Sequence, residues 1–383
     1  MSSQPRLAAR LAQIQPFHVM EVLAKAREME RAGRSVIHLE VGEPDFPTPA
    51  PIVARAEQAL RAGLTRYTPA EGLPELRAAI ADHYPAAIRP SPERIALVPG
   101  SSAALLVAFA LLLDPGDEVL LADPGYPCNA NFIHLLGGVP KRLSCGPEVN
   151  YQLRPEAIRA HWSERTRAVL VGSPANPTGS LVTAAEMTAV ADQVRTLGGT
   201  LVVDELYHGL VYEGDVRTAL HDGDDIFVVN GFSKYHGMTG WRLGWLVAPA
   251  GYRRAVARLC QNLFISAPTI SQQAALAAFA PEVSAELVRR REAFRARRDL
   301  LVPALRQLGF KVPLLPAGAF YVYADVSDLT DDSAAFAARI LEQTGVAITP
   351  GRDFGVYRQA EHLRFSYAAP LEQLEEAVRR LSA

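Results

Sequence analysis

Short apolar runs alternate with helix-like segments between about residue 50 and residue 280. The runs are apolar at nearly every position, which is typical of parallel strands that are covered by helices on both faces. We therefore expect strands at residues 94–98, 118–122, 168–172, 200–204, 226–230 and 244–248. Helical patterns lie between them, for example at 103–113 and 184–199. This alternation predicts an α/β fold in which a mostly parallel sheet lies between helices.

The last hundred residues follow a different pattern. It predicts a charged helix, a strand, a helix and a strand, at residues 281–309, 318–326, 331–345 and 362–368. The first fifty residues contain no series of buried strands either. We therefore expect a large domain over 49–285 and a smaller α+β domain built from both chain ends, 1–48 and 286–383. The helix near 281–309 is expected to connect the two.

Composition and charge exclude several classes of protein. Apolar residues make up 49% and charged residues 21% of the 383 residues, which is an ordinary globular balance. The formal net charge is -2, so the basic excess of a nucleic-acid-binding protein is missing. Three scattered cysteines favour neither a disulfide framework nor a zinc site, and no His/Asp/Glu cluster has the spacing of metal ligands.

The longest apolar run, 103–113, is too short to span a membrane, and the first twenty residues lack the apolar core of a signal peptide. We expect a soluble, cytoplasmic protein.

Polar side chains follow five of the expected strands. They are the segment Pro99–Ser102, the segment Asp123–Pro127, the segment Ser173–Gly179, Asp204 with Tyr207, and Ser233–Lys234 with Arg242. Ligands of open α/β sheets bind beyond the carboxyl ends of the strands. Each feature alone is weak, but their common placement predicts one binding site.

Three of these features favour an anion and a reactive amine. Ser101 and Ser102 open an apolar helix, whose free N–H groups can bind an anion, although they could also be a plain helix cap. Lys234 follows a buried strand, where desolvation would lower its pKa and favour Schiff-base chemistry, whereas most lysines are simply surface residues. Arg242 could bind the same anion or pair with a structural carboxylate.

Four further side chains suit a flat heterocycle. Asp204 ends an apolar strand and needs a cationic partner, such as a protonated ring nitrogen, because an unpaired buried carboxylate costs free energy. Tyr207 and Asn176 could donate to a phenolate oxygen, and Tyr126 could stack on the ring. Together with the anion site and the amine, these groups describe pyridoxal 5'-phosphate.

Several motifs resemble those of the fold-type I pyridoxal-phosphate-dependent aminotransferases of class I/II, which include aspartate and aromatic aminotransferases. They are SKYHGMTGWRLG, SPANPTG, VDELY, DPGYP and HLRFSYA. The resemblance runs from LEVGEPDFPTP (39–49) to RFSYA (364–368), and it includes RYTPAEGLPELR (66–77) and TPGRDFG (349–355). It therefore covers nearly the whole chain.

The resemblance implies roles for individual residues. Lys234 would form the internal aldimine, Asp204 would pair with the pyridine nitrogen, and Tyr126 would stack on the ring. Asn176 and Tyr207 would donate to the ring oxygen O3′. We count Lys234, Asp204 and Tyr207 as the catalytic residues that it implies.

The resemblance also assigns the phosphate and the substrate. The phosphate would bind to Ser101, Ser102, Ser233 and Arg242. Arg364 would hold the substrate α-carboxylate with help from Asn176 and the backbone at Gly42. Tyr67 matches a tyrosine that reaches the phosphate of the neighbouring subunit, which implies a homodimer. One position departs from the pattern, since many relatives have serine where this chain has Gly231.

The implied activity is transfer of an amino group from an L-amino acid to a 2-oxo acid. The alternative is another reaction on this fold, such as C–S β-elimination or cyclopropane formation. A regulator with a fused DNA-binding domain is disfavoured, because only about 35 residues precede LEVGEPDF.

We expect apolar or aromatic donors to be preferred over aspartate, because residues 261–268 contain no Lys or Arg and Ser102 replaces the lysine of one acid-binding branch. Leu263, Phe264 and Ile265 could contact an apolar side chain, although a cation near Arg10 could restore acid binding.

Overall fold

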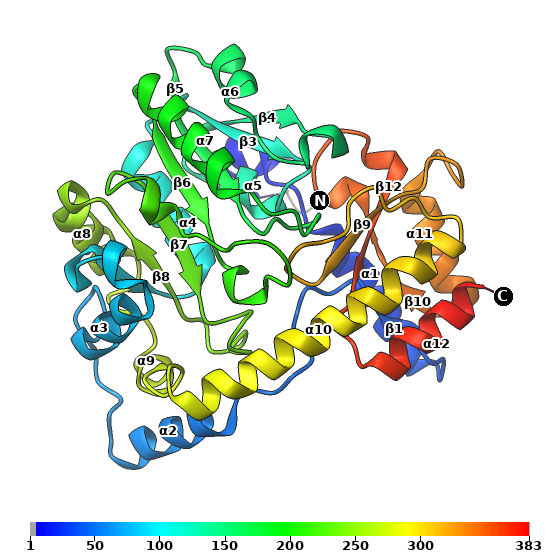
Figure 1. The fold of residues 1–383 in the computed structure, drawn as a ribbon, viewed down its shortest axis with the longest axis horizontal. Helices are drawn as coiled ribbons and strands as arrows, with labels where there is room; N and C mark the ends of the chain where they lie inside the picture. Colours follow the sequence, from blue (N-terminus) through cyan, green and yellow to red (C-terminus); the bar gives the residue numbers. More distant parts are fainter. Residues whose placement is uncertain (1–4, 383) are drawn as a thin grey trace.

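The computed structural model describes residues 5–382, and its largest sheet has seven strands. Their order is β2 (Ile95–Val98), β8 (Gly244–Val247), β7 (Phe227–Gly231), β6 (Thr200–Asp204), β5 (Thr166–Gly172), β3 (Glu118–Asp123) and β4 (Val139–Ser144). Strand β8 runs antiparallel to both of its neighbours, and all other neighbouring strands are parallel. This mostly parallel sheet between helices confirms the predicted α/β fold (Figure 1).

Helices cover both faces of this sheet. One face packs against α4 (Ser101–Leu112), α5 (Pro127–Leu135) and α8 (Arg253–Leu263). The other packs against α2 (Ala50–Arg61), α3 (Pro74–His83), α6 (Pro155–His161), α7 (Ala184–Thr196) and α9 (Thr269–Ala275). Successive strand residues join different core clusters, as Val202 and Val203 do. Both faces are thus buried, which explains why these strands are apolar throughout.

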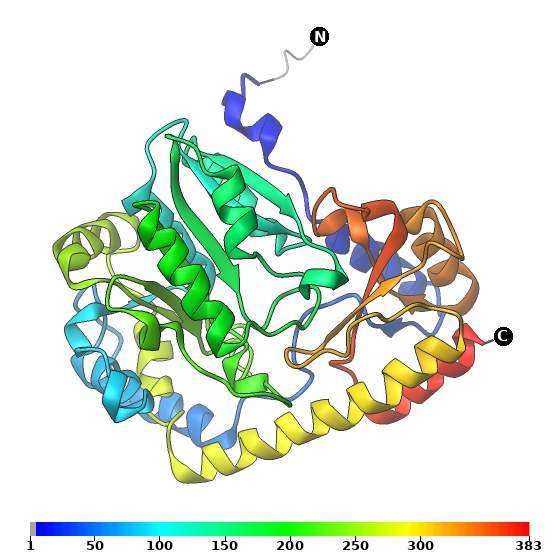
Figure 2. The ribbon, with the colours of Figure 1, turned by 45° about the horizontal axis from the view of Figure 1, so that its top comes forward.

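A second group of elements comes from the two chain ends. It contains a three-stranded antiparallel sheet in the order β11 (Thr349–Pro350), β12 (His362–Ser366) and β9 (Tyr321–Asp325). It also contains β1 (Ile37–His38), which pairs in parallel with β10 (Val346–Ala347). The helices α1 (His18–Arg31), α11 (Ser333–Thr344) and α12 (Leu371–Leu381) belong to the same region. The long helix α10 (Pro281–Gln307) runs from the large sheet to this group (Figures 1 and 2). The domain boundaries at 49 and 285 stay a prediction.

Strand β4 is a strand that the sequence pattern did not predict. Its sequence VPKRLS contains a proline and two cations, and of its side chains only Leu143 is buried. It pairs only with β3 at the end of the strand order, so it is an edge strand. Edge strands can contain proline and charged residues, because one side of an edge strand forms no hydrogen bonds with another strand. The predicted strands all exist, with ends shifted by up to three residues.

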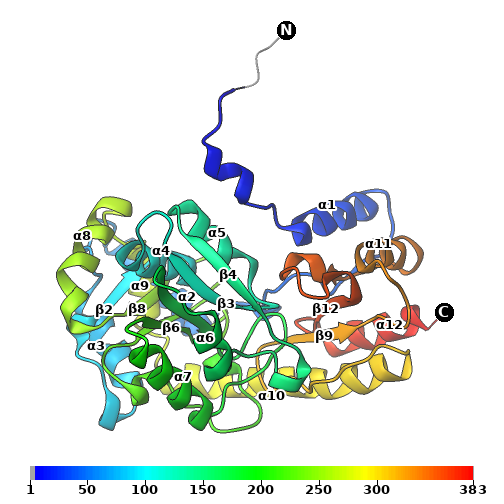
Figure 3. The same ribbon diagram turned by 90° about the horizontal axis from the view of Figure 1, so that it is seen from above.

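The N-terminal segment extends away from the rest of the molecule (Figure 3). This segment contains the short 3₁₀ helix η1 (Ala9–Gln13). The Arg10 guanidinium in η1 donates a hydrogen bond to the Leu135 carbonyl at 3.1 Å. The other 3₁₀ helices are η2 (Ala86–Ile88), η3 (Pro92–Arg94), η4 (Pro147–Val149), η5 (His208–Leu210), η6 (Ala219–Asp222), η7 (Ala250–Tyr252), η8 (Gly351–Asp353) and η9 (Gln359–Glu361). Within residues 5–382 there is no helix with both the length and the apolar character needed to cross a membrane.

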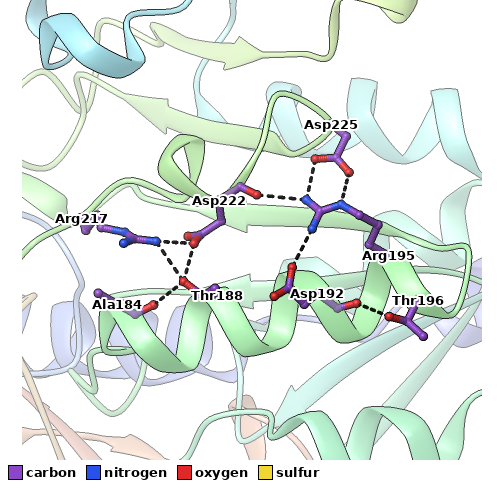
Figure 4. Close-up of polar contacts among 8 residues, drawn as sticks. All are labelled: Ala184, Thr188, Asp192, Arg195, Thr196, Arg217, Asp222 and Asp225. Carbon is purple, nitrogen blue, oxygen red and sulfur yellow. Dashed lines mark hydrogen bonds and ion pairs between the residues drawn. The ribbon is translucent and has the colours of Figure 1, made fainter.

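A polar network fixes the connection between β6 and β7, the strands that carry Asp204 and lead to Lys234 (Figure 4). Arg195 on α7 donates to the two carboxylate oxygens of Asp225 at 2.8 and 2.9 Å. Nearby, Asp222 pairs with Arg217 and accepts a hydrogen bond from the Thr188 hydroxyl at 2.5 Å. Both contacts hold this connection against α7.

Candidate functional site

A cavity of about 630 Å³ lies at the carboxyl ends of the central strands. Residues of the large sheet, of the smaller sheet and of the N-terminal segment line it together. All predicted site residues except Tyr67 belong to its lining: Gly42, Ser101, Ser102, Tyr126, Asn176, Asp204, Tyr207, Ser233, Lys234, Arg242 and Arg364. The geometry thus brings these residues together, and their individual roles stay predictions.

One end of the cavity has the donors of an anion pocket. Helix α4 begins at Ser101, and Gly100 caps it with a φ of 88°, a backbone conformation that favours glycine. A Cβ on Gly100 would lie 2.5 Å from a guanidinium nitrogen of Arg242, so only glycine lets the arginine approach. The hydroxyl of Ser233 faces the same cavity from the loop after β7. Helix N–H groups, hydroxyls and a guanidinium suit a doubly charged anion such as a phosphate.

Lys234 belongs to the cavity lining. Its Nζ donates to the Gly42 carbonyl at 2.6 Å. Burial lowers the pKa of Lys234 to about 8, and the nearby Glu43 carboxylate opposes this shift. A lysine with this pKa is partly neutral near pH 8, so it can act as a nucleophile or as a base.

Asp204 ends β6 and faces the same cavity. Burial raises the pKa of Asp204 to about 6, although the Leu206 N–H donates to its carboxylate at 3.0 Å. Within residues 5–382, no lysine, arginine or histidine forms an ion pair with this carboxylate. A buried carboxylate without a protein cation is suited to a cationic ligand.

Two phenols lie together beside the lysine. The hydroxyls of Tyr207 and Tyr321 are 2.8 Å apart, and burial raises the pKa of Tyr207 well above its ordinary value. Tyr207 is therefore a neutral donor at neutral pH. A Cβ on Gly42 would lie 2.2 Å from the Tyr321 hydroxyl, so glycine is required there. Sequence reasoning placed Tyr321 in a strand but gave it no part in the site.

Arg364 is buried on β12 and faces the cavity. It donates to the Asn176 side-chain oxygen at 3.0 Å and also to the backbone carbonyl of Glu40. Its Cζ lies 4.4 Å from the ring centroid of Tyr321 and 4.8 Å from that of Phe354. The rings and the acceptors hold the guanidinium in one orientation, as a bidentate carboxylate site requires.

Phe17 and the first turns of α1 form a further wall of the cavity that the sequence did not predict. Phe17, Met20 and Leu23 line the cavity, and the Phe17 ring lies 6.2 Å from the ring of Tyr126. The start of α1 is attached to Asp353, whose carboxylate accepts from the N–H groups of residues 18 and 19 at 2.9 and 3.2 Å. No local pattern in residues 14–23 indicated this placement.

Two arginines outside the predicted set also line the cavity. They are Arg142 on β4 and Arg352 in η8, and both are exposed. Arg352 lies 3.6 Å from the Glu21 carboxylate. Arg10, the cation considered from the sequence, is not part of the lining. An amino-acid substrate with an acidic side chain could therefore contact a positive charge at the cavity wall, which would favour acidic donors.

Tyr67 is the predicted site residue that the cavity does not include. It lies in the connection between α2 and α3 with 79% of its surface exposed. Its predicted contact is with a neighbouring subunit, so a single chain neither supports nor contradicts that role.

Comparison with known proteins agrees with this geometry. Residues 34–381 match the family model for aminotransferase class I and II, so the chain belongs to this family. It is 42% identical to a valine–pyruvate aminotransferase of Mycobacterium tuberculosis, over 99% of this chain and 98% of that protein. It is 37% identical to an aspartate/prephenate aminotransferase of Thermus thermophilus, over 98% of both. The crystal structure of an aminotransferase from Mycobacterium tuberculosis superposes with a TM-score of 0.95 at 41% identity, covering 98% of each chain. The protein is therefore an aminotransferase, as the sequence predicted.

Proposed function

We propose that this aminotransferase uses pyridoxal 5'-phosphate, held at Lys234, to move an amino group from an apolar or aromatic L-amino acid to a 2-oxo acid. The observation that carries the proposal is the convergence of Lys234, Asp204, Arg364 and the anion pocket on one cavity. Each of the four supplies something different: an amine, a carboxylate without a protein cation, a carboxylate receptor and a phosphate receptor. Together these groups suit amino-group transfer with this cofactor.

The residues present fit this cofactor. The phosphate would bind at the start of α4, with Ser101, Ser102, Ser233 and Arg242 as donors. Asp204 would pair with the protonated ring nitrogen, Tyr207 and Asn176 would donate to the ring oxygen, and Tyr126 would stack on the ring. When bound, the cofactor supplies an electron sink for the negative charge that develops at the substrate α-carbon.

Lys234 would move the proton in this reaction. Its pKa of about 8 makes the neutral amine available near pH 8 without a second base. Its contact with the Gly42 carbonyl keeps the amine within the cavity. Tyr207, held by Tyr321, stays protonated and would stabilise negative charge at the ring oxygen.

Arg364 would bind the α-carboxylate that donor and acceptor share. We expect Arg364→Lys to raise KM for every amino acid and oxo acid by about tenfold or more, because lysine cannot form the planar bidentate contact. The measurement is KM for alanine and pyruvate. Arg352→Lys is the matched control, since it changes another arginine of the same cavity, and it should leave both values nearly unchanged. A KM within twofold of wild type for Arg364→Lys would place the carboxylate site elsewhere.

Donor preference follows from the cavity wall. Phe17, Met20 and Leu23 offer apolar contacts, whereas Leu263 and Ile265 are exposed and do not belong to the lining of this cavity. We expect phenylalanine, leucine and valine to exceed aspartate in kcat/KM, because a side-chain carboxylate would lie against apolar groups. The two named relatives act on valine and on aspartate or prephenate, so both outcomes occur in this family.

The test is a donor screen with one common oxo acid as acceptor. Amino-group transfer to the acceptor supports the proposed reaction, and its rate ranks the donors. Release of pyruvate and ammonia from a cysteine conjugate, without use of the acceptor, would instead support β-elimination. Aspartate preferred by tenfold or more would overturn the apolar preference and direct attention to Arg142 and Arg352.

We also propose that the protein is a homodimer. Large apolar side chains are exposed on two neighbouring segments, with Leu64 and Tyr67 on one and Ile265 on the other. The two segments are joined by a hydrogen bond from the Thr269 hydroxyl to the Arg66 carbonyl at 2.8 Å. An exposed apolar surface of this kind is typical of a subunit interface. Sedimentation equilibrium tests this proposal, because a homodimer has twice the mass of the 41.5 kDa chain.

A further inference from the structure

Glu40 is a fully buried carboxylate close to Arg364, and the reaction described above gives it no part. Its side chain has no exposed surface. One oxygen lies 2.7 Å from the His38 Nδ1, and the other oxygen has no hydrogen-bond partner among residues 5–382. The Nε2 of His38 lies 3.3 Å from the Glu30 carboxylate on α1. A buried carboxylate needs a cation, and His38 is the group that supplies it here.

The backbone of the same segment supports both cationic groups of the site. The Glu40 carbonyl accepts hydrogen bonds from the Arg364 guanidinium and from the Thr349 hydroxyl, the latter at 3.0 Å. Two residues later, the Gly42 carbonyl accepts from Lys234 at 2.6 Å. The Leu39 carbonyl accepts from the backbone at residue 366, two residues after Arg364, at 2.7 Å. The direction of the Glu40 carbonyl therefore affects the direction of the guanidinium.

The contact between His38 and Glu40 joins residues i and i+2. Side chains at this spacing lie on the same face of an extended chain, so their contact stabilises the extended conformation between them. Strand β1 itself pairs with β10 over only two residues, 37 and 38. The ion pair thus extends the ordered part of the chain toward the carbonyl that Arg364 uses.

We propose that His38 and Glu40 are positioning residues, which hold the Glu40 carbonyl so that Arg364 faces the substrate α-carboxylate. This rests on the proposed role of Arg364. Neither side chain belongs to the cavity lining, so they would act through Arg364 and not on the substrate. We expect a larger effect on substrate affinity than on the chemistry at Lys234, because Arg364 contacts the Glu40 carbonyl itself, whereas Lys234 contacts the carbonyl two residues later.

Titration of His38 gives the pair a pH dependence. The contact with Glu40 raises the pKa of His38 to about 8, burial opposes this, and Glu30 adds to the rise. Strand β1 packs on β10, which carries no titratable side chain, and Glu30 of α1 contacts the His38 ring. Because the pKa is raised by folding, the charged pair is complete below about pH 6.5 and is lost as the pH rises through about 8.

The experiment measures KM and kcat for alanine and pyruvate in the holoenzyme. Glu40→Ala should raise KM about tenfold, as for a misplaced hydrogen bond to a charged group, with kcat within about threefold. Glu40→Gln keeps the shape and an acceptor for His38, and it should recover most of the affinity. Glu30→Gln is the matched control, because it changes the exposed partner of His38, and it should leave KM within twofold. Binding of 3-phenylpropionate, followed by calorimetry, should weaken in parallel with KM.

The outcomes are separable. A folded Glu40→Ala enzyme with unchanged KM, or with a lower kcat alone, would overturn the proposal. If Arg364→Lys also leaves KM unchanged, the role of Arg364 itself has failed. If Glu40→Ala does not fold, the pH profile decides. The wild-type KM should then rise more through about pH 8 than that of His38→Gln, because both enzymes share the titration of Lys234 but only the wild type has that of His38. Equal rises in both enzymes would overturn the proposal.

Discussion

Replacing Lys234 with alanine should remove nearly all transaminase activity, with a loss of about 10²–10⁴-fold from the missing proton transfer alone. The side chain is the amine of the cavity, and burial lowers its pKa to about 8. Alanine can neither attach the cofactor nor move a proton at the substrate α-carbon. We therefore expect the variant to lose the covalent link that borohydride reduction would otherwise make permanent.

Lys141→Ala is the control for this change. Lys141 lies on β4, outside the cavity lining, and donates to the His161 carbonyl at 2.9 Å. Its replacement should leave the rate and the covalent link as in the wild type. A Lys234→Ala protein that turns over at a rate near that of the wild type would end the mechanism proposed above.

The strands of the large sheet could be predicted because their pattern has one physical cause. Val202 and Val203 are neighbours in β6, yet each is buried in a different core cluster on opposite faces of the sheet. Such a strand is apolar at every position. A surface helix differs, because only the residues on its buried face are apolar. Strand β4 has one exposed face and lies at the edge, so its polar sequence resembles a loop.

The site was predictable to the extent that it lies at strand ends. Asp204, Asn176 and Lys234 follow consecutive strands of a parallel sheet, and topology alone brings such ends to one edge. Phe17 and Tyr321 reach the cavity from the N-terminal segment and from β9. Their placement depends on contacts between distant parts of the chain, which leave no local pattern.

The contact between Glu40 and Arg364 shows the same limit. The two residues are 324 positions apart, and the carbonyl that joins them belongs to the backbone. A backbone acceptor has no sequence signature. The acidic side chain of Glu40, which the sequence does show, turns instead toward His38. Sequence reasoning could therefore indicate the arginine as a candidate but not the backbone carbonyl that it contacts.

Asp204→Asn should change stability and catalysis in opposite directions. Burial raises the pKa of Asp204 to about 6 from an ordinary value of 3.8, a shift of about two units, or roughly 3 kcal/mol. A raised carboxylate pKa means that folding favours the protonated form, so this group lowers stability as the pH rises from about 4 to about 6. Asparagine carries no charge, so the cofactor-free variant should be more stable than the wild type at pH 7, by up to about 3 kcal/mol. The difference should vanish below about pH 4.

Bound cofactor should reverse this order. Its protonated ring nitrogen would then pair with Asp204, and losing one partner of a buried ion pair costs about 3–5 kcal/mol. The variant should therefore gain less thermal stability from pyridoxal phosphate and should transaminate about 10²–10³-fold more slowly. Melting temperatures at pH 4 and 7, with and without the cofactor, measure both effects.

Glu205→Gln is the matched control for Asp204→Asn, because Glu205 is the next residue and its carboxyl pKa is also raised by burial. Burial raises the pKa of Glu205 to about 8, so it is already mostly neutral at pH 7. Its Oε1 accepts from the Thr218 hydroxyl at 2.9 Å and from the Ala219 N–H at 2.7 Å, and glutamine can accept both bonds. Its stability should therefore change little at pH 7 and should not depend on the cofactor. If the cofactor stabilises Asp204→Asn as much as the wild type, then Asp204 is not the partner of the ring nitrogen, and another group must keep that nitrogen protonated.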